Sequence, residues 1–321
     1  MQDFEVLDLF SGMGGFSYGF ANNGFKTTGV DIKEEAEISY KKLTKGDFVI
    51  SDLHSSMIRD KEYDIIIGGP PCRPWSPMNT TKRGLTHPDY TLVSKFLAHI
   101  KYHTPKLFIM ENVPPLSKDS TLIDLISSTK KMGYSVDMVN VIYSDFGASV
   151  KRKRLLILGM LNSEVNVFIS KMNFNLKKAK TVRDSISYLQ KCDYGSVPDH
   201  VWPNLKTIRN YEEYYKTGKY GWRILNWDEP SPSFGNVMKT YTLHPDSSFK
   251  KGYLRTISVA ESARIMGFPK SYCFPDNITM GKKYQMIVDS VSPVFSNVLA
   301  KVSYSILTGD VNFVSSRKQN I

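Results

Sequence analysis

The chain has 321 residues, of which 41% are hydrophobic and 23% charged, and its formal net charge is +11. This composition is typical of a folded protein of one or two domains and excludes an intrinsically disordered chain. No apolar run approaches the roughly 18 residues of a membrane-spanning helix, and the polar N-terminus lacks the pattern of a signal peptide. Three widely spaced cysteines exclude a disulfide framework and a Cys-x-x-Cys metal site, so we expect a cytoplasmic protein without a metal.

The first half of the chain alternates apolar runs with amphipathic stretches, which predicts a mostly parallel, doubly wound α/β sheet. From about residue 162 to residue 255 this regularity fades, which predicts a smaller, loop-rich domain. A Ser-x-x-Glu capping box at 258–261 predicts a helix that ends at Met266. The expected strands lie at 4–10, 26–30, 63–67, 106–110, 136–142 and 154–159. The other expected helices lie at 16–23, 89–103, 122–132 and 291–307.

Positive charge is concentrated in the middle third of the chain. Residues 1–149 hold 16 basic and 18 acidic residues, whereas residues 150–256 hold 19 basic and 9 acidic ones. The latter segment also holds Trp202, Trp222 and Trp227 and several tyrosines. Basic residues interleaved with aromatic ones are typical of a surface that binds a polyanion and stacks on its bases. A solvated lysine-rich surface would give the same count, so charge alone leaves both readings open.

The first candidate site is the glycine-rich turn Gly12-Met13-Gly14-Gly15, between an expected strand and an expected helix. Glycines let the backbone approach a ligand, and a helix start offers N–H groups without partners. Asp31 ends the next strand, where a carboxylate can bind ribose hydroxyls. The spacing differs from Gly-x-Gly-x-x-Gly, so it favours a nucleoside-type cofactor other than NAD, while a purely structural turn stays open.

The second candidate is Cys72, in the segment Gly68–Ser76 directly after an apolar strand. Ligands of open parallel sheets bind at the carboxyl ends of the strands. Two prolines stiffen the backbone before this cysteine, which favours a presented nucleophile over a buried core residue. An ordinary thiol is only a few per cent thiolate at neutral pH, so this role needs positive charge nearby.

A carboxylate and two arginines form the third and fourth candidates. Glu111 ends another apolar strand, where a carboxylate is costly unless it has a partner. It is either a salt-bridged structural residue or a proton donor with a raised pKa. Arg152 and Arg154 are two residues apart at the start of a strand, so their side chains would share one face. The alternative is an ordinary basic flank of a β-strand.

These motifs occur in a fixed order along the chain, namely Phe10–Gly15, Pro70–Ser76, Glu111–Val113, Arg152-x-Arg154 and Glu261–Pro269. In this order they resemble the DNA (cytosine-5)-methyltransferase family, from Asp8 to about Leu299. The gap in the middle third is where that family has its variable target-recognition domain. The resemblance therefore implies a catalytic and cofactor-binding domain over 1–165, completed by about 270–321, and a small basic target-recognition domain over about 166–269.

The resemblance implies methyl transfer from S-adenosylmethionine, which leaves S-adenosylhomocysteine, to carbon 5 of a cytosine flipped out of double-stranded DNA. Cys72 would attack carbon 6, and Glu111 would contact ring nitrogen 3 and assist its protonation. Arg154 would contact the base, with Arg152 beside it, and their charge would favour the thiolate. Extruding the base costs a few kcal/mol, which contacts in the pocket must offset.

The same resemblance implies binding residues. Asp31 would bind the ribose hydroxyls and Asp52 the adenine amino group. The implied cofactor-binding residues are Phe10, Gly12, Gly14, Gly15, Asp31, Ile32, Asp52, Leu53, Pro70 and Ser290. The implied DNA-binding residues are Arg73, Ser76, Lys82, Arg83 and Ser233, the first four in a loop that closes over DNA. Arg255 and Arg264 fall where the two domains join, and we expect them to be mainly structural.

The chain departs from the family pattern in three places. Arg73 and Val150 stand where glutamine is common, and Val288-Asp289-Ser290-Val291 replaces a Gly-Asn-Ala/Ser-Val segment. The last change removes a glycine and adds bulk near the methionine end of the cofactor. We expect a monomeric modification enzyme of a restriction-modification system, associated with the nucleoid in a prokaryote. A tRNA cytosine-5 methyltransferase and a catalytically silent DNA-binding relative stay open as alternatives.

Overall fold

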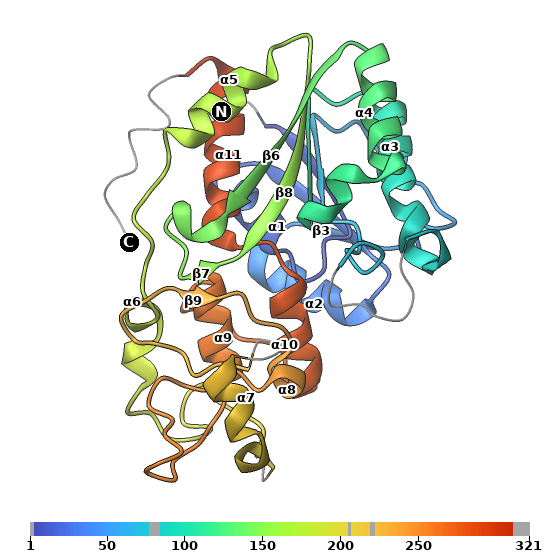
Figure 1. Cartoon of the computed structure of the whole chain (residues 1–321). Coiled ribbons are helices and arrows are strands. Elements are labelled where there is room, and N and C mark those ends of the chain that lie inside the picture. Colours follow the sequence, from blue (N-terminus) through green and yellow to red (C-terminus); the bar gives the residue numbers. More distant parts are fainter. Residues whose placement is uncertain (1–2, 77–83, 205–206, 219–221, 311–321) are drawn as a thin grey trace. The chain divides into compact units, whose positions relative to one another are not determined.

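The computed structural model describes residues 3–76, 84–204, 207–218 and 222–310 (Figure 1). Two compact units are built from interleaved segments of the chain. The first unit comprises residues 1–142, 153–176 and 295–321, and the second comprises residues 143–152 and 177–294. Within the described ranges, no helix combines the length and the apolar character that crossing a membrane requires.

A sheet forms the centre of the first unit (Figure 1). It has seven strands in the order β3-β2-β1-β4-β5-β8-β6. The first five strands in this order run parallel, and β8 pairs antiparallel with both β5 and β6. The winding reverses at β1, which has β2 on one side and β4 on the other, as in doubly wound folds. The strands are β1 Glu5–Leu9, β2 Lys26–Asp31, β3 Asp47–Ile50, β4 Ile65–Gly68, β5 Leu107–Asn112, β6 Tyr134–Ile142 and β8 Lys153–Leu161.

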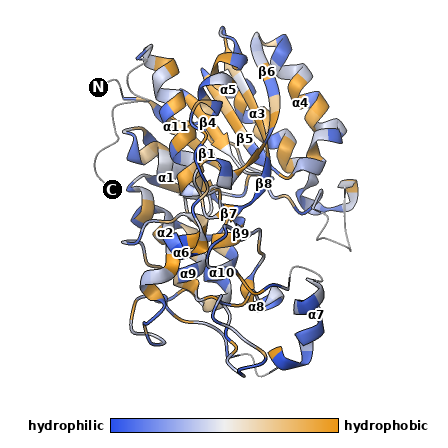
Figure 2. Cartoon of the chain, turned by 60° about the vertical axis from the view of Figure 1, so that its left-hand side comes forward, coloured by the Kyte–Doolittle hydropathy of each residue, from blue (hydrophilic) through white to orange (hydrophobic). Residues whose placement is uncertain are grey.

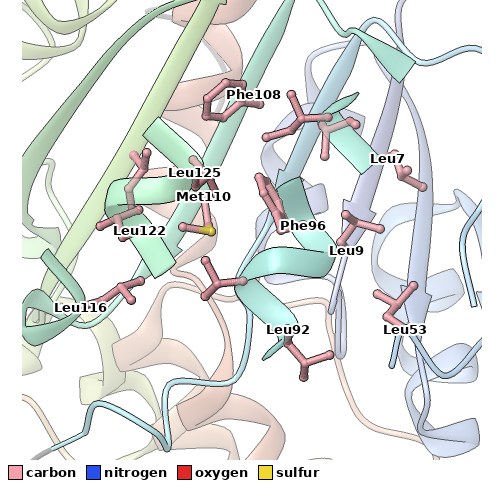
Figure 3. Close-up of a cluster of buried hydrophobic side chains, with 14 of the residues drawn as sticks. Leu7, Leu9, Leu53, Leu92, Phe96, Phe108, Met110, Leu116, Leu122 and Leu125 are labelled. Carbon is pink, nitrogen blue, oxygen red and sulfur yellow. The ribbon is translucent and has the colours of Figure 1, made fainter. Parts of the chain in front are cut away.

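One face of this sheet packs against two helices, α3 (Leu92–His103) and α4 (Ser120–Lys131), in a continuous hydrophobic core (Figure 3). Alternate strand residues, such as Leu7 and Leu9, point to this face because side chains alternate along a strand. All four residues of β4 are buried, and the strand is strongly hydrophobic in Figure 2. Parallel strands covered on both faces have such continuous apolar sequences.

The other face carries α1 (Gly15–Asn22), α5 (Val165–Asn173) and the part of α11 (Pro293–Thr308) that belongs to the first unit. The backbones of α1 and α11 meet at Gly19, where an added Cβ would overlap the backbone of Ser296. The amide of Gly19 also donates to Ser296 Oγ at 3.1 Å. A residue without a side chain is therefore required at this crossing. α2 (Glu34–Thr44) connects β2 to β3.

The second unit consists mainly of short helices and loops. Its one described two-stranded sheet pairs β7 (Val150–Lys151) with β9 (Ser231–Pro232) in parallel. Both halves of the expected capping box are present at α9, between the side chains of Ser258 and Glu261 and the opposite backbone amides. Its helices are α6 Val182–Ile186, α7 Glu212–Thr217, α8 Val237–Thr240, α9 Val259–Met266 and α10 Met280–Asp289.

A buried ion pair stabilises this unit. Arg255 donates two hydrogen bonds of 2.8 Å to the carboxylate of Glu261, and its guanidinium lies 4.6 Å from the ring centroid of Trp202. His244 lies beside this pair, with Nε2 at 3.5 Å from Glu261 Oε1. Burial lowers the pKa of His244 to about 4, so this imidazole is neutral at pH 7.

The three tryptophans of the middle third pack against side chains of their own unit. Trp222 is 9% exposed and sits among Tyr211, Tyr214, Tyr215 and Tyr241, with ring centroids 4.5–5.7 Å away. Trp227 donates to Asp246 Oδ1 at 2.8 Å. Packing within a unit that has little regular structure is thus one role of these aromatic residues, most completely for Trp222.

Each strand and helix that the sequence predicts coincides with an observed element to within a few residues. The sequence patterns did not indicate α2, β3 or α10, and the expected loss of regularity after residue 162 is wrong for α5. The two compact units divide the chain after residues 142, 152, 176 and 294, whereas the expected functional division at about 165 and 270 stays a prediction. Residues 270–294 belong to the second unit, where Tyr284 of α10 donates to the Ile257 carbonyl at 2.7 Å.

Candidate active site

The candidate site lies at the carboxyl ends of β1, β4 and β5. These strands are parallel neighbours, with Leu9 opposite Gly68 and Gly68 opposite Met110. The segments that follow them are the glycine-rich turn, the cysteine segment and the Glu-Asn-Val segment. Because parallel neighbours end at the same edge, the sheet brings three of the predicted motifs together at its topological switch point.

The glycine-rich turn has a backbone that depends on its glycines. Gly12 and Gly14 have φ values of 51° and 88°, and even Phe10 has a positive φ of 62°. A Cβ at Gly14 would approach Tyr40 Cδ2 to 2.8 Å, whereas a Cβ at Gly12 would meet no atom within 4 Å. Gly14 is therefore fixed by packing beneath the turn, while Gly12 faces open space. Gly15 begins α1, with Gly14 at its N-cap.

The Asp31 carboxylate holds the glycine-rich turn against β2. Its Oδ2 accepts a hydrogen bond from the Gly12 amide at 2.9 Å, and its Oδ1 accepts one from the Lys33 amide at 3.0 Å. The next residue, Ile32, is 58% exposed, which is unusual for so large an apolar side chain. An anchored carboxylate and an uncovered apolar side chain thus lie next to each other beside the turn.

Asp52 and Leu53 follow β3, the neighbour of β2. Asp52 Oδ1 accepts a hydrogen bond from the His54 amide at 2.9 Å, which shapes a turn at this strand end. The side chain of Leu53 is 4% exposed and belongs to the hydrophobic core. Of the predicted pair, Asp52 is thus the one that is partly accessible at the surface.

Asp8 lies beneath the same turn and was not singled out by the sequence patterns. It is 1% exposed, its Oδ2 accepts from Ser17 Oγ at 2.6 Å, and Ser17 Oγ in turn accepts from the Tyr40 hydroxyl at 2.8 Å. Burial raises the pKa of Asp8 to about 7, and the hydrogen bond from Ser17 opposes that rise. This chain of polar groups fixes α1 to β1 under the glycines.

Asn112 fixes the cysteine segment to the end of β5. Its Nδ2 donates to the Pro70 carbonyl at 3.0 Å, and its Oδ1 accepts from the Val113 amide at 2.8 Å. Asn112 is 1% exposed, so both bonds are shielded from water. Cys72 is partly buried at the edge of the hydrophobic core. The pattern Glu-Asn-Val therefore supplies the anchor of the cysteine segment as well as a carboxylate.

Glu111 forms an ion pair with Arg154 from the neighbouring strand β8. Arg154 Nε lies 2.7 Å from Glu111 Oε1, and both side chains are nearly buried. A Cβ added at Gly69 would lie 3.6 Å from Glu111 Oε2, so this second oxygen faces the start of the cysteine segment. Glu111 is thus salt-bridged through Oε1, as one of its two expected roles requires. Its Oε2 points toward the segment that carries Cys72.

The remaining predicted residues have varied environments. Arg152 is 7% exposed, and its guanidinium donates to the Val288 carbonyl in the last turn of α10 at 2.6 Å, a favourable place for a cation. Ser290 follows α10, and Ser290 Oγ donates to the Val291 carbonyl at 3.2 Å. These two residues belong to the second unit, where Ser233 is exposed.

In the first unit, Arg73 is exposed and Ser76 is half-buried. Lys82 and Arg83 lie outside the described residues. Arg255 and Arg264 are both buried, and Arg264 donates to the carbonyls of Lys270 and Tyr272. Within the described ranges, no group of three or more His, Cys, Asp and Glu side chains could hold a metal ion.

Comparison with known proteins agrees with this arrangement. The chain is 26% identical over 325 residues to the Type II methyltransferase M.FnuDI of Fusobacterium nucleatum, covering 92% of this chain and 93% of that protein. It is 31% identical over 286 residues to the Type II methyltransferase M.HindV of Haemophilus influenzae, covering 84% of this chain and 87% of that protein.

The fold is shared with solved structures. The Dnmt2 methyltransferase of S. pombe superposes with a TM-score of 0.73 at 19% identity, covering 95% of this chain and 99% of that one. The methyltransferase EhMeth of Entamoeba histolytica gives a TM-score of 0.72 at 18% identity, covering 96% and 99%. The sequence profile described as C-5 cytosine-specific DNA methylase matches residues 4–305, and the chain belongs to this family of DNA methyltransferases.

Proposed function

We propose that this enzyme methylates carbon 5 of a cytosine that is flipped out of double-stranded DNA, through a transient covalent bond to Cys72. The observation that carries this proposal is the anchoring of the cysteine segment to the strand that ends in Glu111, through the 3.0 Å bond between Asn112 and the Pro70 carbonyl. A nucleophile and a carboxylate are thereby presented from neighbouring strand ends of one rigid sheet.

The glycine-rich turn fits the adenosyl cofactor that the family implies. Gly12 faces open space, and the exposed Ile32 follows the anchored carboxylate of Asp31. In this proposal Asp31 accepts from the ribose hydroxyls with lone pairs that its two backbone contacts leave over, and Asp52 accepts from the adenine amino group. S-adenosylmethionine, when bound, supplies a methyl group on a positively charged sulfur.

Cys72 starts the chemistry on the base. Its thiolate forms a bond to carbon 6 of the cytosine, and the electron pair of the 5,6 double bond then makes carbon 5 nucleophilic. Transfer of the methyl group to carbon 5 would break its bond to the sulfonium and leave S-adenosylhomocysteine. Loss of the carbon-5 proton to solvent then drives the electron pair back and expels the thiolate. The protein emerges unchanged, with one hydrogen of the base replaced by a methyl group.

Glu111 holds ring nitrogen 3 in this scheme and assists its protonation while the adduct forms. Arg154 pairs with Glu111 Oε1 at 2.7 Å. Arg154 therefore orients the carboxyl group in addition to its proposed contact with the base. The proposed contacts of Arg152 and Ser290 remain predictions of the family resemblance.

We propose that the basic middle segment binds DNA phosphates. Residues 150–256 hold 19 basic and 9 acidic residues, and charge of this sign attracts a polyanion. The names of the relatives M.FnuDI and M.HindV, both Type II methyltransferases, support a role as the modification enzyme of a restriction-modification system. We further propose that the enzyme acts as a cytoplasmic monomer without a metal.

Bisulfite sequencing of DNA from a bacterial host that expresses the protein tests this function. Expression of the wild type should protect cytosines in one short motif from conversion, and Cys72→Ser should abolish the protection. Cys192→Ser is the matched control, since Cys192 lies outside the proposed site, and should protect the motif like the wild type. Duplex DNA with 5-fluorocytosine at that motif should form a denaturation-resistant adduct with the wild type alone. Unprotected host DNA, with methylation found in tRNA instead, would refute the proposal.

A further inference from the structure

The carboxylate of Asp119 accepts four described hydrogen bonds, one of them from Trp75 in the cysteine segment. Its Oδ2 accepts from Trp75 Nε1 at 2.7 Å, and its Oδ1 accepts from the Tyr90 hydroxyl at 2.9 Å. Oδ1 also accepts from the amide and the hydroxyl of Thr121, at 2.9 Å and 2.6 Å, which caps α4. One carboxylate thus joins three separate segments of the chain.

Two of these segments follow the predicted nucleophile Cys72 in the chain, one with Trp75 three residues later and one with Tyr90 eighteen residues later. The Cys72 carbonyl accepts from the amides of Trp75 and Ser76, at 3.0 Å and 2.9 Å, so Trp75 closes the turn that begins at Cys72. The indole is 6% exposed, belongs to the hydrophobic core and lies 5.6 Å from the Tyr90 ring. A displacement of Trp75 would therefore displace the turn that holds Cys72.

The charge of Asp119 strengthens this contact. Burial opposes its ionisation, but the hydrogen bonds from Thr121, Trp75 and Tyr90 outweigh burial and hold the pKa of Asp119 below its usual value. An ionised acceptor makes shorter and stronger hydrogen bonds than a neutral one, in keeping with the 2.7 Å contact to the indole. Asn112 anchors the same cysteine segment upstream, at Pro70, and Asp119 anchors it downstream.

We propose that Asp119 is a positioning residue for Cys72, which it holds in place through Trp75 and Tyr90. This inference rests on the proposed function in that Cys72 is taken as the nucleophile. Its physical content is independent of that function: the carboxylate of Asp119 fixes the position and exposure of the Cys72 thiol.

Three substitutions test the inference. Asp119→Asn keeps a good N-cap for α4 but weakens the bonds to Trp75 and Tyr90. Trp75→Phe removes the indole N–H and one of the two fused rings, and keeps an aromatic ring in the core. Thr121→Val is the matched control, because it removes one side-chain bond to Asp119 and leaves those of Trp75 and Tyr90.

Alkylation by iodoacetamide, followed at each cysteine by mass spectrometry, is the first measurement. Asp119→Asn and Trp75→Phe should raise the rate at Cys72 by about tenfold, the factor expected for loss of one charge-assisted hydrogen bond, because the partly buried thiol is released. The rates at Cys192 and Cys273 should stay unchanged, and Thr121→Val should match the wild type at all three. Equal Cys72 rates in all four proteins would overturn the inference, whether or not the wild type methylates DNA.

The second measurement separates positioning from general loss of structure. The rate of adduct formation on 5-fluorocytosine DNA should fall about tenfold in Asp119→Asn, while the Kd for S-adenosylmethionine stays the same. In the double variant, Trp75→Phe should add no further loss, since both changes break one contact. Additive losses would contradict action through Trp75. Absence of an adduct in the wild type would count against the proposed function alone, since the alkylation rates still decide the role of Asp119.

Discussion

Asn112→Asp is the sharpest test of how the cysteine segment is held, because the new side chain has the same shape and, when ionised, lacks the N–H donors of the amide. The bond from Nδ2 to the Pro70 carbonyl at 3.0 Å is replaced by two facing oxygen atoms, while the other oxygen still accepts from the Val113 amide. The side chain at this position is 1% exposed, so water cannot compensate.

The expected cost follows from these contacts. Losing a net hydrogen bond and leaving a buried carbonyl unpaired together destabilise the first unit by roughly 2–4 kcal/mol. For a unit of this size that lowers its melting temperature by roughly 4–16 °C. A buried carboxyl facing a carbonyl has a raised pKa, and the protonated form can donate to Pro70. The deficit relative to wild type should therefore be small near pH 4 and grow as pH rises.

Differential scanning calorimetry between pH 4.5 and 7.5, together with the rate of methyl transfer at pH 7.5, checks this prediction. Asn140→Asp is the control, since Asn140 is exposed on β6 and its substitution should change neither quantity. An Asn112→Asp protein with wild-type stability and activity at pH 7.5 would refute the role assigned to the bond with Pro70.

Four other outcomes can be measured directly. Glu111→Gln should lower kcat by about 10²–10⁴-fold because a proton donor is lost, and should leave the Kd for DNA unchanged because Arg154 keeps a partner. An unaltered kcat would show that Glu111 does not assist protonation. Gly14→Ala should weaken binding of S-adenosylmethionine in calorimetric titrations, because φ is 88° and a Cβ would approach Tyr40 to 2.8 Å; wild-type affinity would show that the turn tolerates a side chain. Urea unfolding of the second unit should need less denaturant as pH falls from about 6.5 to 4, and its free energy of unfolding should fall by about 3 kcal/mol. His244 has a pKa of about 4 when folded and binds a proton more readily when unfolded, so acid favours the unfolded state. A stability that does not change with pH would contradict the burial of His244. DNA affinity should fall about 10³-fold between 50 and 200 mM salt if six phosphates are contacted, and a nearly flat series would exclude the basic segment as the phosphate-binding surface.

The sequence predicted the sheet well because its central strands are continuous apolar runs that end in glycine or a carboxylate. It did not indicate α2, whose N-cap residue Lys33 provides no side-chain hydrogen bond, or β3, a short and partly exposed strand at the edge of the sheet. The ends of the compact units could not be read from the sequence because no low-complexity linker marks them.

The candidate site was predictable where function depends on local order in the chain, as at Gly14, Cys72 and Glu111. Its supports were not, because each joins residues far apart in sequence. Asn112 reaches Pro70 across 42 positions, and Asp119 reaches Trp75 across 44. The tryptophans of the middle third show the same limit, since the packing of Trp222 among tyrosines of the second unit depends on residues that are not neighbours in the sequence.

The close crossing of α1 and α11 at Gly19 has a consequence for biosynthesis. A ribosome makes the glycine-bearing helix among the first 22 residues, yet the segment that covers it begins only at residue 295. A nascent chain therefore lacks the helix that packs on α1 during most of translation, whereas the second unit, residues 143–152 and 177–294, is complete as soon as residue 294 has been made. Truncation before residue 295 should accordingly yield a product that binds chaperones and holds α1 and the glycine-rich turn less firmly.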